Sequence, residues 1–227
     1  MFRYIAKRVL QAIPLLFVIS FIVFSLIHIA PYDVIDSITT PNMSQEQIDL
    51  LRQRYGLDQP FLVQYFLWIR NVLTGNLGFS LVSQSSISQE LATRIPNTMR
   101  LVIPAYLTAL LLAIILGLLA AANKGKIWDR IIDAVASLGI AVPTFWFAMI
   151  LIYVFGYLLN MFPIIGMYTV GKEGDFGDFL QHFILPYITL TVAFFPDLTR
   201  YIRASATQQV SEDYVICLLY TSPSPRD

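Results

Sequence analysis

The chain has 227 residues, of which 56% are hydrophobic and 13% are charged, and its 15 basic and 15 acidic residues leave no net charge. Soluble domains usually carry about 25% charged residues, so this composition argues against a soluble domain and indicates a polytopic membrane protein. The only cysteine is Cys217, which excludes a disulfide framework and a cysteine-based metal site.

The first predicted membrane span is the apolar run 9–30, which follows a basic start. Residues 1–8 contain three basic side chains and no acidic one. The run is longer than the apolar part of a signal peptide, about 7–15 residues, and residues 28–31 (HIAP) lack the small-x-small cleavage pattern. We therefore predict an uncleaved span whose N-terminus lies in the cytoplasm.

The polar segment 31–97 follows this span, and we predict that it lies outside the membrane with two helices of its own. Ser44 and Gln47 have the spacing of a capping box at the start of the first helix, and Pro60 opens the second. One face of the second helix is rich in aromatic residues, which suits the membrane surface or the top of a helical bundle, or else the docking of an external partner. This face consists of Phe61, Tyr65, Trp68, Ile69 and Val72.

Two uncharged runs, 101–122 and 134–159, are each long enough to cross a bilayer, for which about 20 helical residues suffice. The loop 123–133 between them carries three basic residues, whereas the loop 160–181 has more acidic than basic ones. Because positive charge in a short loop marks the cytoplasmic side, we predict a hairpin with a cytoplasmic turn. A fourth, weaker span is predicted at 179–196.

Small residues recur at every fourth position of the run 101–122, which would place them close to one stripe of a helix. In lipid, such a stripe allows the backbone of a neighbouring helix to approach closely. We predict that this stripe packs against a helix of this chain or of a partner. Plain alanine filler is the alternative, but helix propensity does not account for glycine at 117. The stripe consists of Ala105, Ala109, Ala113, Gly117 and Ala121.

Charged residues return at the end of the fourth span, where Asp197, Arg200 and Arg203 follow about one turn apart. The long arginine side chains can extend to the inner interface. Asp197 is spaced either to pair with Arg200 or to cap the inner end of a pathway, and pairing is the commoner use. Prolines that permit kinks lie in or at the ends of the spans, at positions 14, 104, 143, 186 and 196.

The sequence offers no catalytic, cofactor-binding or metal-binding motif. Residues 124–126 (KGK) lack the upstream glycine and the following Ser or Thr of a phosphate loop, and neither His-Glu-x-x-His nor Gly-x-Ser-x-Gly occurs. The first three spans contain no Asp, Glu, Lys or Arg, which disfavours an ion-driven transporter because ionisable groups in spans commonly mark an ion pathway. We therefore predict that the chain is not an enzyme and that another subunit supplies the energy for any transport.

Several stretches of the sequence, in this order and spacing, are similar to one family of permeases, and together they cover residues 1 to about 215. The chain resembles the B-type permease subunit of bacterial dipeptide and oligopeptide ABC importers. The stretches are Arg3-Tyr4-Ile5-x-Lys7-Arg8 with the first span ending at Ala30-Pro31, 54–60 (RYGLDQP), 75–80 (GNLGFS), 94–98 (RIPNT), 126–129 (KIWD), 142–145 (VPTF) and 184–186 (ILP).

This resemblance implies an all-α, polytopic transmembrane helical bundle with the type I ABC importer permease core, of which about four of six expected spans are present. It implies a multi-pass subunit of the bacterial inner membrane that pairs with a second permease subunit and binds two ATPase subunits. An extracytoplasmic solute-binding protein would deliver peptides, and ATP binding would switch the pair between inward-open and outward-open states. Nickel or another small solute, or a non-transporting membrane scaffold, are the alternatives. We expect contact with membrane lipid, no nucleic-acid partner and no cofactor, with ATP hydrolysis in the ATPases.

The resemblance also divides the chain into three parts. We expect an N-terminal span with an extracytoplasmic helical segment at 1–93, a partial ABC-importer core at 94–215, and an atypical tail at 216–227. The tail has neither a helix pattern nor family character, so we expect a C-terminally truncated permease whose tail is not native and which cannot couple to ATP hydrolysis alone. The lead-in to the ATPase-coupling loop consists of Ser211, Glu212, Asp213, Tyr214 and Val215.

Overall fold

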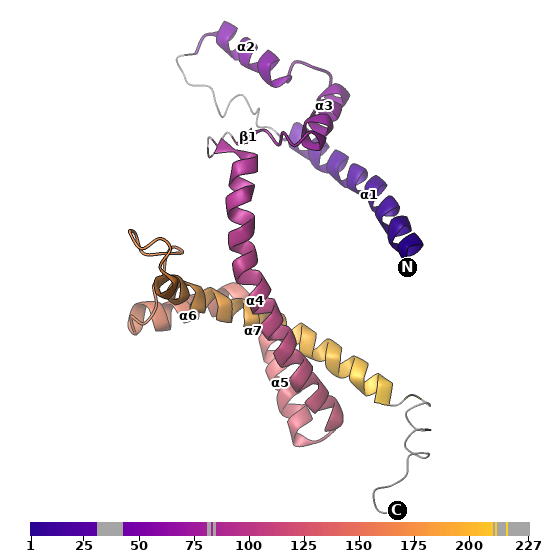
Figure 1. Cartoon of the computed structure of the whole chain (residues 1–227), viewed down its shortest axis with the longest axis vertical. Coiled ribbons are helices and arrows are strands. Elements are labelled where there is room, and N and C mark those ends of the chain that lie inside the picture. The colour runs from indigo at the N-terminus through magenta and orange to yellow at the C-terminus, as the bar shows by residue number, and fades with distance from the viewer. Residues whose placement is uncertain (31–42, 81–82, 84, 211, 213–216, 218–227) are drawn as a thin grey trace, which may run out of the picture. The chain divides into compact units, whose positions relative to one another are not determined.

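The computed structural model describes residues 1–30, 43–80, 83, 85–210, 212 and 217. The chain forms two compact units, Met1–Arg94 and Ile95–Asp227, which are treated separately below. Most of the predicted coupling lead-in and of the predicted tail therefore lies outside the described residues. The elements are α1 (Phe2–Ile29), α2 (Gln45–Tyr55), α3 (Phe61–Leu73), β1 (Phe79–Ser80), β2 (Ser85–Ser86), α4 (Ile87–Ala122), α5 (Ile127–Ala141), α6 (Thr144–Leu151), the π-helix η1 (Ile152–Leu158) and α7 (Phe176–Val210) (Figure 1).

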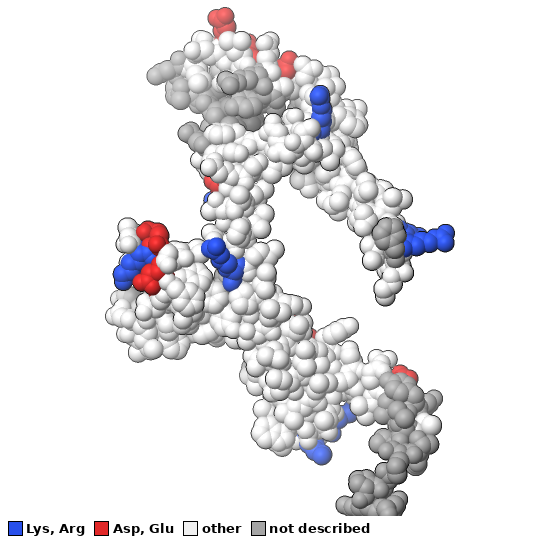
Figure 2. All heavy atoms as spheres, in the orientation of Figure 1, with Lys and Arg blue, Asp and Glu red and all other residues white. Residues whose placement is uncertain are grey.

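The first helix, α1, contains the predicted first span except for its last residue, Ala30, and also contains the basic N-terminal residues. Figure 2 shows the basic side chains gathered at the N-terminal end of α1, while most of the visible face of this helix is uncharged. Pro14 lies inside the helix without ending it, which membrane helices tolerate. The helix is long and apolar enough to cross a bilayer.

The capping box predicted at the start of α2 is confirmed. The Ser44 hydroxyl oxygen accepts a hydrogen bond from the backbone N–H of Gln47 (3.4 Å), and the Gln47 side chain accepts one from the N–H of Ser44 (3.0 Å). The helix ends at Gly56, whose φ of 67° lies in the left-handed region that glycine adopts easily. Pro60 immediately precedes α3, as predicted.

The aromatic face of α3 packs against α1. Tyr65 is 4% exposed, and its O–H donates to the Phe17 carbonyl oxygen (3.1 Å) and lies 2.9 Å from the Ser20 hydroxyl oxygen. The aromatic side chains of both helices surround this contact, with ring centroids at 5.0–6.2 Å. Of the alternatives left by the sequence, the structure shows this face covering a helix of the same chain. The surrounding rings are those of Phe21, Phe24, His28, Phe61 and Trp68.

The turn between α4 and α5 is shorter than predicted. α4 ends at Ala122 and α5 begins at Ile127, so the prediction that 123–133 is entirely a loop is wrong. The carboxylate of Asp129 accepts the backbone N–H of Gly125 (2.8 Å), and Gly125 has a φ of 79°. This bond satisfies the backbone N–H of Gly125, which would otherwise need a partner in the turn. The turn can therefore be short.

The second uncharged run, 134–159, is broken instead of forming one straight helix. α5 ends at Ala141, Pro143 precedes α6, and the axis bends by 93° between the two parts. Proline has no backbone N–H and disfavours helical geometry in the residue before it, which explains the break. The described residues hold three helices that can cross a membrane, or four if the bent pair is one span, which confirms the predicted count.

In the second unit, α7 packs on α5 and α6, and it crosses α4 (Figure 1). Near one end of this contact, the Thr191 hydroxyl lies 3.5 Å from the Ala105 carbonyl oxygen, and near the other end Ile202 lies against Gly117. A Cβ atom added at Gly117 would lie 2.9 Å from Ile202 Cγ2, and one added at Gly139 would lie 2.5 Å from Pro196 Cγ. The helices therefore approach most closely where one of them lacks a side chain.

The small residues of α4 are largely buried, and two of them, Ala105 and Gly117, lie against α7. Ala105, Ala109, Ala113 and Gly117 are buried, whereas Ala121 is partly exposed and Ala120 is buried in its place. Each step of four residues turns the helix about 40° beyond a full turn, so a strict four-residue stripe drifts around the helix. The final step of three residues, from Gly117 to Ala120, turns the helix back, so that Ala120 is the buried position instead of Ala121.

Candidate functional site

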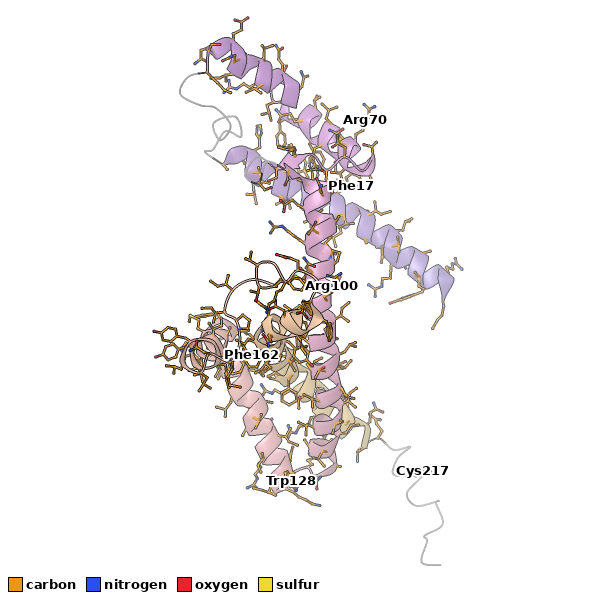
Figure 3. The ribbon with its side chains drawn as sticks, turned by 60° about the vertical axis from the view of Figure 1, so that its left-hand side comes forward. Phe17, Arg70, Arg100, Trp128, Phe162 and Cys217 are labelled. Atoms are coloured by element: carbon orange, nitrogen blue, oxygen red, sulfur yellow. The ribbon has the colours of Figure 1, made fainter. Side chains whose placement is uncertain are left out.

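Two groups of polar side chains lie at opposite ends of the second unit. One lies at the α4–α5 turn, where Figure 3 labels Trp128. The other lies around Arg100 on α4 and the segment 160–175, where Figure 3 labels Arg100 and Phe162. Between them the helices present mainly apolar side chains. The polar groups at these two ends are therefore where specific recognition or coupling has to be sought.

At the α4–α5 turn, Asp129 of α5 forms a two-bond ion pair with Arg203 of α7. Arg203 Nε donates to Asp129 Oδ1 (2.6 Å) and Nη2 donates to Oδ2 (3.0 Å), a geometry that only arginine offers to a carboxylate. Asp129 is 4% exposed, and Asp133 adds a longer contact of 3.5 Å to Arg203 Nη1. With the bond from Gly125, this cluster ties the turn to α7.

Of the three predicted inner-end charges, only Arg203 takes part in this cluster. Asp197 and Arg200 are both exposed, and the described residues show no ion pair between them. The pairing that the sequence favoured for Asp197 is therefore not formed. Sequence reasoning missed the partners Asp129 and Asp133, which are spaced to share one face of α5, because pairing across 74 positions requires knowing that α5 packs on α7.

At the other end of the unit, Asp178 in the first turn of α7 fastens the preceding segment. The Thr169 backbone N–H donates to Asp178 Oδ2 (2.6 Å) and the Thr169 hydroxyl donates to Oδ1 (2.7 Å). Lys172 Nζ lies 4.0 Å from Oδ1, and Asp178 is 6% exposed. These bonds hold the segment 160–175 against the start of α7, so that Gly166 and its neighbours form one wall of a pocket.

His182 lies one turn further along α7 and is 8% exposed. Its Nδ1 lies 2.9 Å from the Asp178 carbonyl oxygen, which can only accept a hydrogen bond, so Nδ1 carries the hydrogen. In the neutral ring Nε2 is then an acceptor. Nδ1 also lies 3.6 Å from Asp178 Oδ2, and the His182 side chain lines two pockets.

Two adjoining pockets, of about 180 and 360 Å³, lie beneath the segment 160–175. They share Leu101, Gly166, His182 and Pro186, so they form two parts of one hollow between α4, α6 and α7. The smaller pocket opens beside Arg100, whose Nη1 lies 3.4 Å from the Asn97 side-chain oxygen. Its walls are otherwise mostly apolar and aromatic, a common composition of small-molecule sites.

Among the described residues, no group of three or more His, Cys, Asp and Glu side chains could hold a metal ion. The arrangement consists of spanning helices, a charged contact at the turn and a small hollow at the opposite end. Such an arrangement offers surfaces that can bind and position a solute.

Two protein-family models together match almost the whole chain. Residues 113–218 match the family described as "Binding-protein-dependent transport system inner membrane component", and residues 1–102 match the corresponding N-terminal family. The chain belongs to this permease family. The predicted resemblance to ABC importer permeases is thereby confirmed, and this family together with several apolar helices makes the chain a multi-pass membrane permease.

Curated relatives of the permease are found in distant bacteria. It is 36% identical over 215 residues to the glutathione transport system permease protein GsiC of Escherichia coli O6:H1 strain CFT073, and 35% identical to that of strain K12. It is 34% identical over 216 residues to the oligopeptide transport system permease protein AppB of Bacillus subtilis strain 168. These alignments cover 95% of this chain and 67–68% of the relatives.

Proposed function

We propose that this permease passes di- and oligopeptides across the bacterial inner membrane by alternating access. The observation that carries the proposal is the similarity to permeases of glutathione and oligopeptide transport systems over 95% of the chain. Glutathione is itself a small peptide, so both relatives name the same class of solute. A permease for nickel or another small solute and a non-transporting scaffold are not favoured by these relatives.

The proposal includes separate subunits for energy and delivery. The permease pairs with a second permease subunit, two ATPase subunits bind from the cytoplasm, and an extracytoplasmic solute-binding protein brings the peptide. The family of binding-protein-dependent permeases supports this assembly. The basic N-terminus and the basic α4–α5 turn support a cytoplasmic N-terminus, because positively charged loops face the cytoplasm.

The parts of the chain take different roles in this proposal. Residues 1–93 form the peptide-family addition, and 94–215 belong to the translocating core. The small residues of α4 allow α7 to lie closely against it, and residues 211–215 lead into the loop that docks on the ATPase.

The Asp129–Arg203 ion pair supports a coupling role for the end of α7. Arg203 lies about two helical turns before residue 211, and its bonds connect α7 to the α4–α5 turn. A displacement of the lead-in by an ATPase would therefore move α7, α4 and α5 together.

Uptake by cells with and without the gene tests the proposal. We expect deletion of the gene to abolish uptake of radiolabelled trialanine and the intact gene to restore it. The intact gene should not restore uptake when the ATPase of the complex is inactive. Uptake of ⁶³Ni²⁺ serves as the control and should be unchanged by deletion. Loss of nickel uptake with normal peptide uptake would contradict the peptide proposal, and loss of neither would favour a scaffold.

A further inference from the structure

We propose that the hollow beside Arg100 is a subsite for the C-terminal carboxylate of the transported peptide. The inference rests on the proposed function and adds the part of the substrate that this hollow recognises. It is carried by three features that meet there: a guanidinium that has no acidic partner among the described residues, an imidazole that lines the pocket, and an aromatic wall. Each of them matches one chemical group at the end of a peptide.

Arg100 supplies the charge. Its guanidinium contacts the amide oxygen of Asn97 at 3.4 Å, and in the described part of the chain no acidic side chain lies within ion-pair distance of it. Arg203, by contrast, is matched to two carboxylates. Arginine binds carboxylates through two parallel N–H bonds, and at the edge of a low-dielectric span such a bond is stronger than in water. An anionic group is therefore the ligand that Arg100 lacks.

His182 supplies an acceptor. Its Nδ1 donates to the Asp178 carbonyl oxygen, so Nε2 of the neutral ring is an acceptor, and the His182 side chain lines the hollow. The last residue of a peptide carries an amide N–H next to its carboxylate, so one ligand can satisfy both Arg100 and His182. An anionic lipid such as phosphatidylglycerol has the charge but no N–H donor.

The walls supply room for a side chain. Met167, Phe179 and Phe183 line the smaller pocket, which continues into the larger one through shared residues. Apolar walls without charged groups accept side chains of many shapes, because dispersion contacts are not directional. The subsite therefore fixes the peptide end and leaves the side chain unselected, which suits a permease for peptides of varied sequence.

The test uses the importer purified with its natural partners and reconstituted in vesicles. We expect R100Q to lower the initial rate of trialanine uptake about tenfold at subsaturating concentration. R100K, which keeps the charge and loses the two-bond geometry, should have an intermediate rate. R94Q removes a positive charge from the same helix, at a residue that pairs with Glu90, and should stay within about twofold of the wild type.

A second measurement locates the peptide end directly. A tripeptide with a benzophenone side chain on its C-terminal residue should label the segment 179–186 in the wild type, and R100Q should reduce this labelling about tenfold. The same group on the N-terminal residue should not label that segment. Because labelling is read on assembled complexes, loss of folding in R100Q would show as loss of the complex itself.

Several outcomes would overturn the subsite while leaving peptide transport intact. They are equal uptake by R100Q and R94Q, no labelling of 179–186 by the C-terminal probe, and equal labelling by the N-terminal probe. Replacing phosphatidylglycerol by the zwitterionic phosphatidylcholine in wild-type vesicles distinguishes an anionic lipid ligand, since a defect equal to that of R100Q would assign Arg100 to an anionic lipid head group. A wild-type importer that takes up no peptide would instead overturn the proposed function, and the subsite with it.

Discussion

The two units hold their helices together in different ways. In the first, α3 is fixed on α1 by large interlocking rings and by a buried tyrosine hydroxyl. In the second, α7 lies on α4 and α5 through small residues, with an ion pair at one end. Aromatic side chains that interlock define one register, whereas small residues present a smoother surface along which helices can shift. The first contact is therefore expected to be static and the second to be the one that moves.

The largest effect is expected from removing the ring of Tyr65, which lies at the centre of the contact between α1 and α3. Y65A leaves a cavity among the surrounding rings, and truncation of a buried aromatic residue costs about 3–5 kcal/mol. Amide hydrogen exchange in α3 should then accelerate about 100-fold or more, since each 1.4 kcal/mol corresponds to a factor of ten. The neighbouring F66A, at a residue that is 63% exposed, should leave α3 protected. Similar exchange in both variants would mean that the rings do not fix α3.

Breaking the ion pair of the second unit should have the next largest effect. R203M leaves the buried Asp129 carboxylate without its arginine, and hydrogen bonds to charged groups contribute about 1.5–3 kcal/mol. We expect exchange of the amides in the α4–α5 turn to rise about 10- to 100-fold, and ATPase activity to lose its stimulation by peptide. R200M removes an exposed arginine from the same helix and is the matched control. Retained stimulation in R203M would argue against coupling through this pair.

Overpacking the close approach of α5 and α7 should cost somewhat less. In G139A the added Cβ lies 2.5 Å from Pro196 Cγ, so the helices must separate, at about 1–2 kcal/mol. We expect slower peptide uptake with normal assembly of the complex, since the substitution acts on the moving contact. S137A, at an exposed position of the same helix, should have no effect. Faster uptake in G139A would contradict the assignment of this contact to motion.

The smallest effect is expected from Y65F, which keeps the ring and removes the hydroxyl group. The bond to the Phe17 carbonyl oxygen is lost (3.1 Å), and one such hydrogen bond contributes about 0.5–1.5 kcal/mol. Exchange in α3 should accelerate about tenfold at most, and uptake should be unchanged. If Y65F matched Y65A, the hydroxyl group instead of ring packing would fix the contact, and the comparison between the units would need revision.

Much of the fold could be predicted because its signals are local. The spans follow from uncharged runs, the start of α2 from Ser44 and Gln47, and the break after Ala141 has a visible cause in Pro143 even though 134–159 was predicted as one span. The family could also be predicted, since its motifs occur in order along the chain. Each of these depends on residues that are close together in sequence.

The sites could be predicted only in part, because they depend on packing between distant segments. Arg203 was identified as an inner-end charge, but its partner Asp129 is 74 positions away. Arg100 and His182 each stand at the edge of an apolar run, and nothing local indicates that they line one hollow. The end of the small-residue stripe at Ala120 likewise reflects helix geometry that a strict repeat of four ignores.

The depth of Tyr65 has a consequence for the surrounding lipid. Its contact with Ser20 lies nine residues before Ile29, the last residue of α1, which is about 14 Å along the helix axis. The 13-residue α3 therefore lies beside the C-terminal half of the first span. Among the described residues of this unit, α3 covers one side of that half of α1, whereas the apolar side chains of the N-terminal half, such as Leu10 and Leu16, remain exposed for contact with lipid or with another subunit.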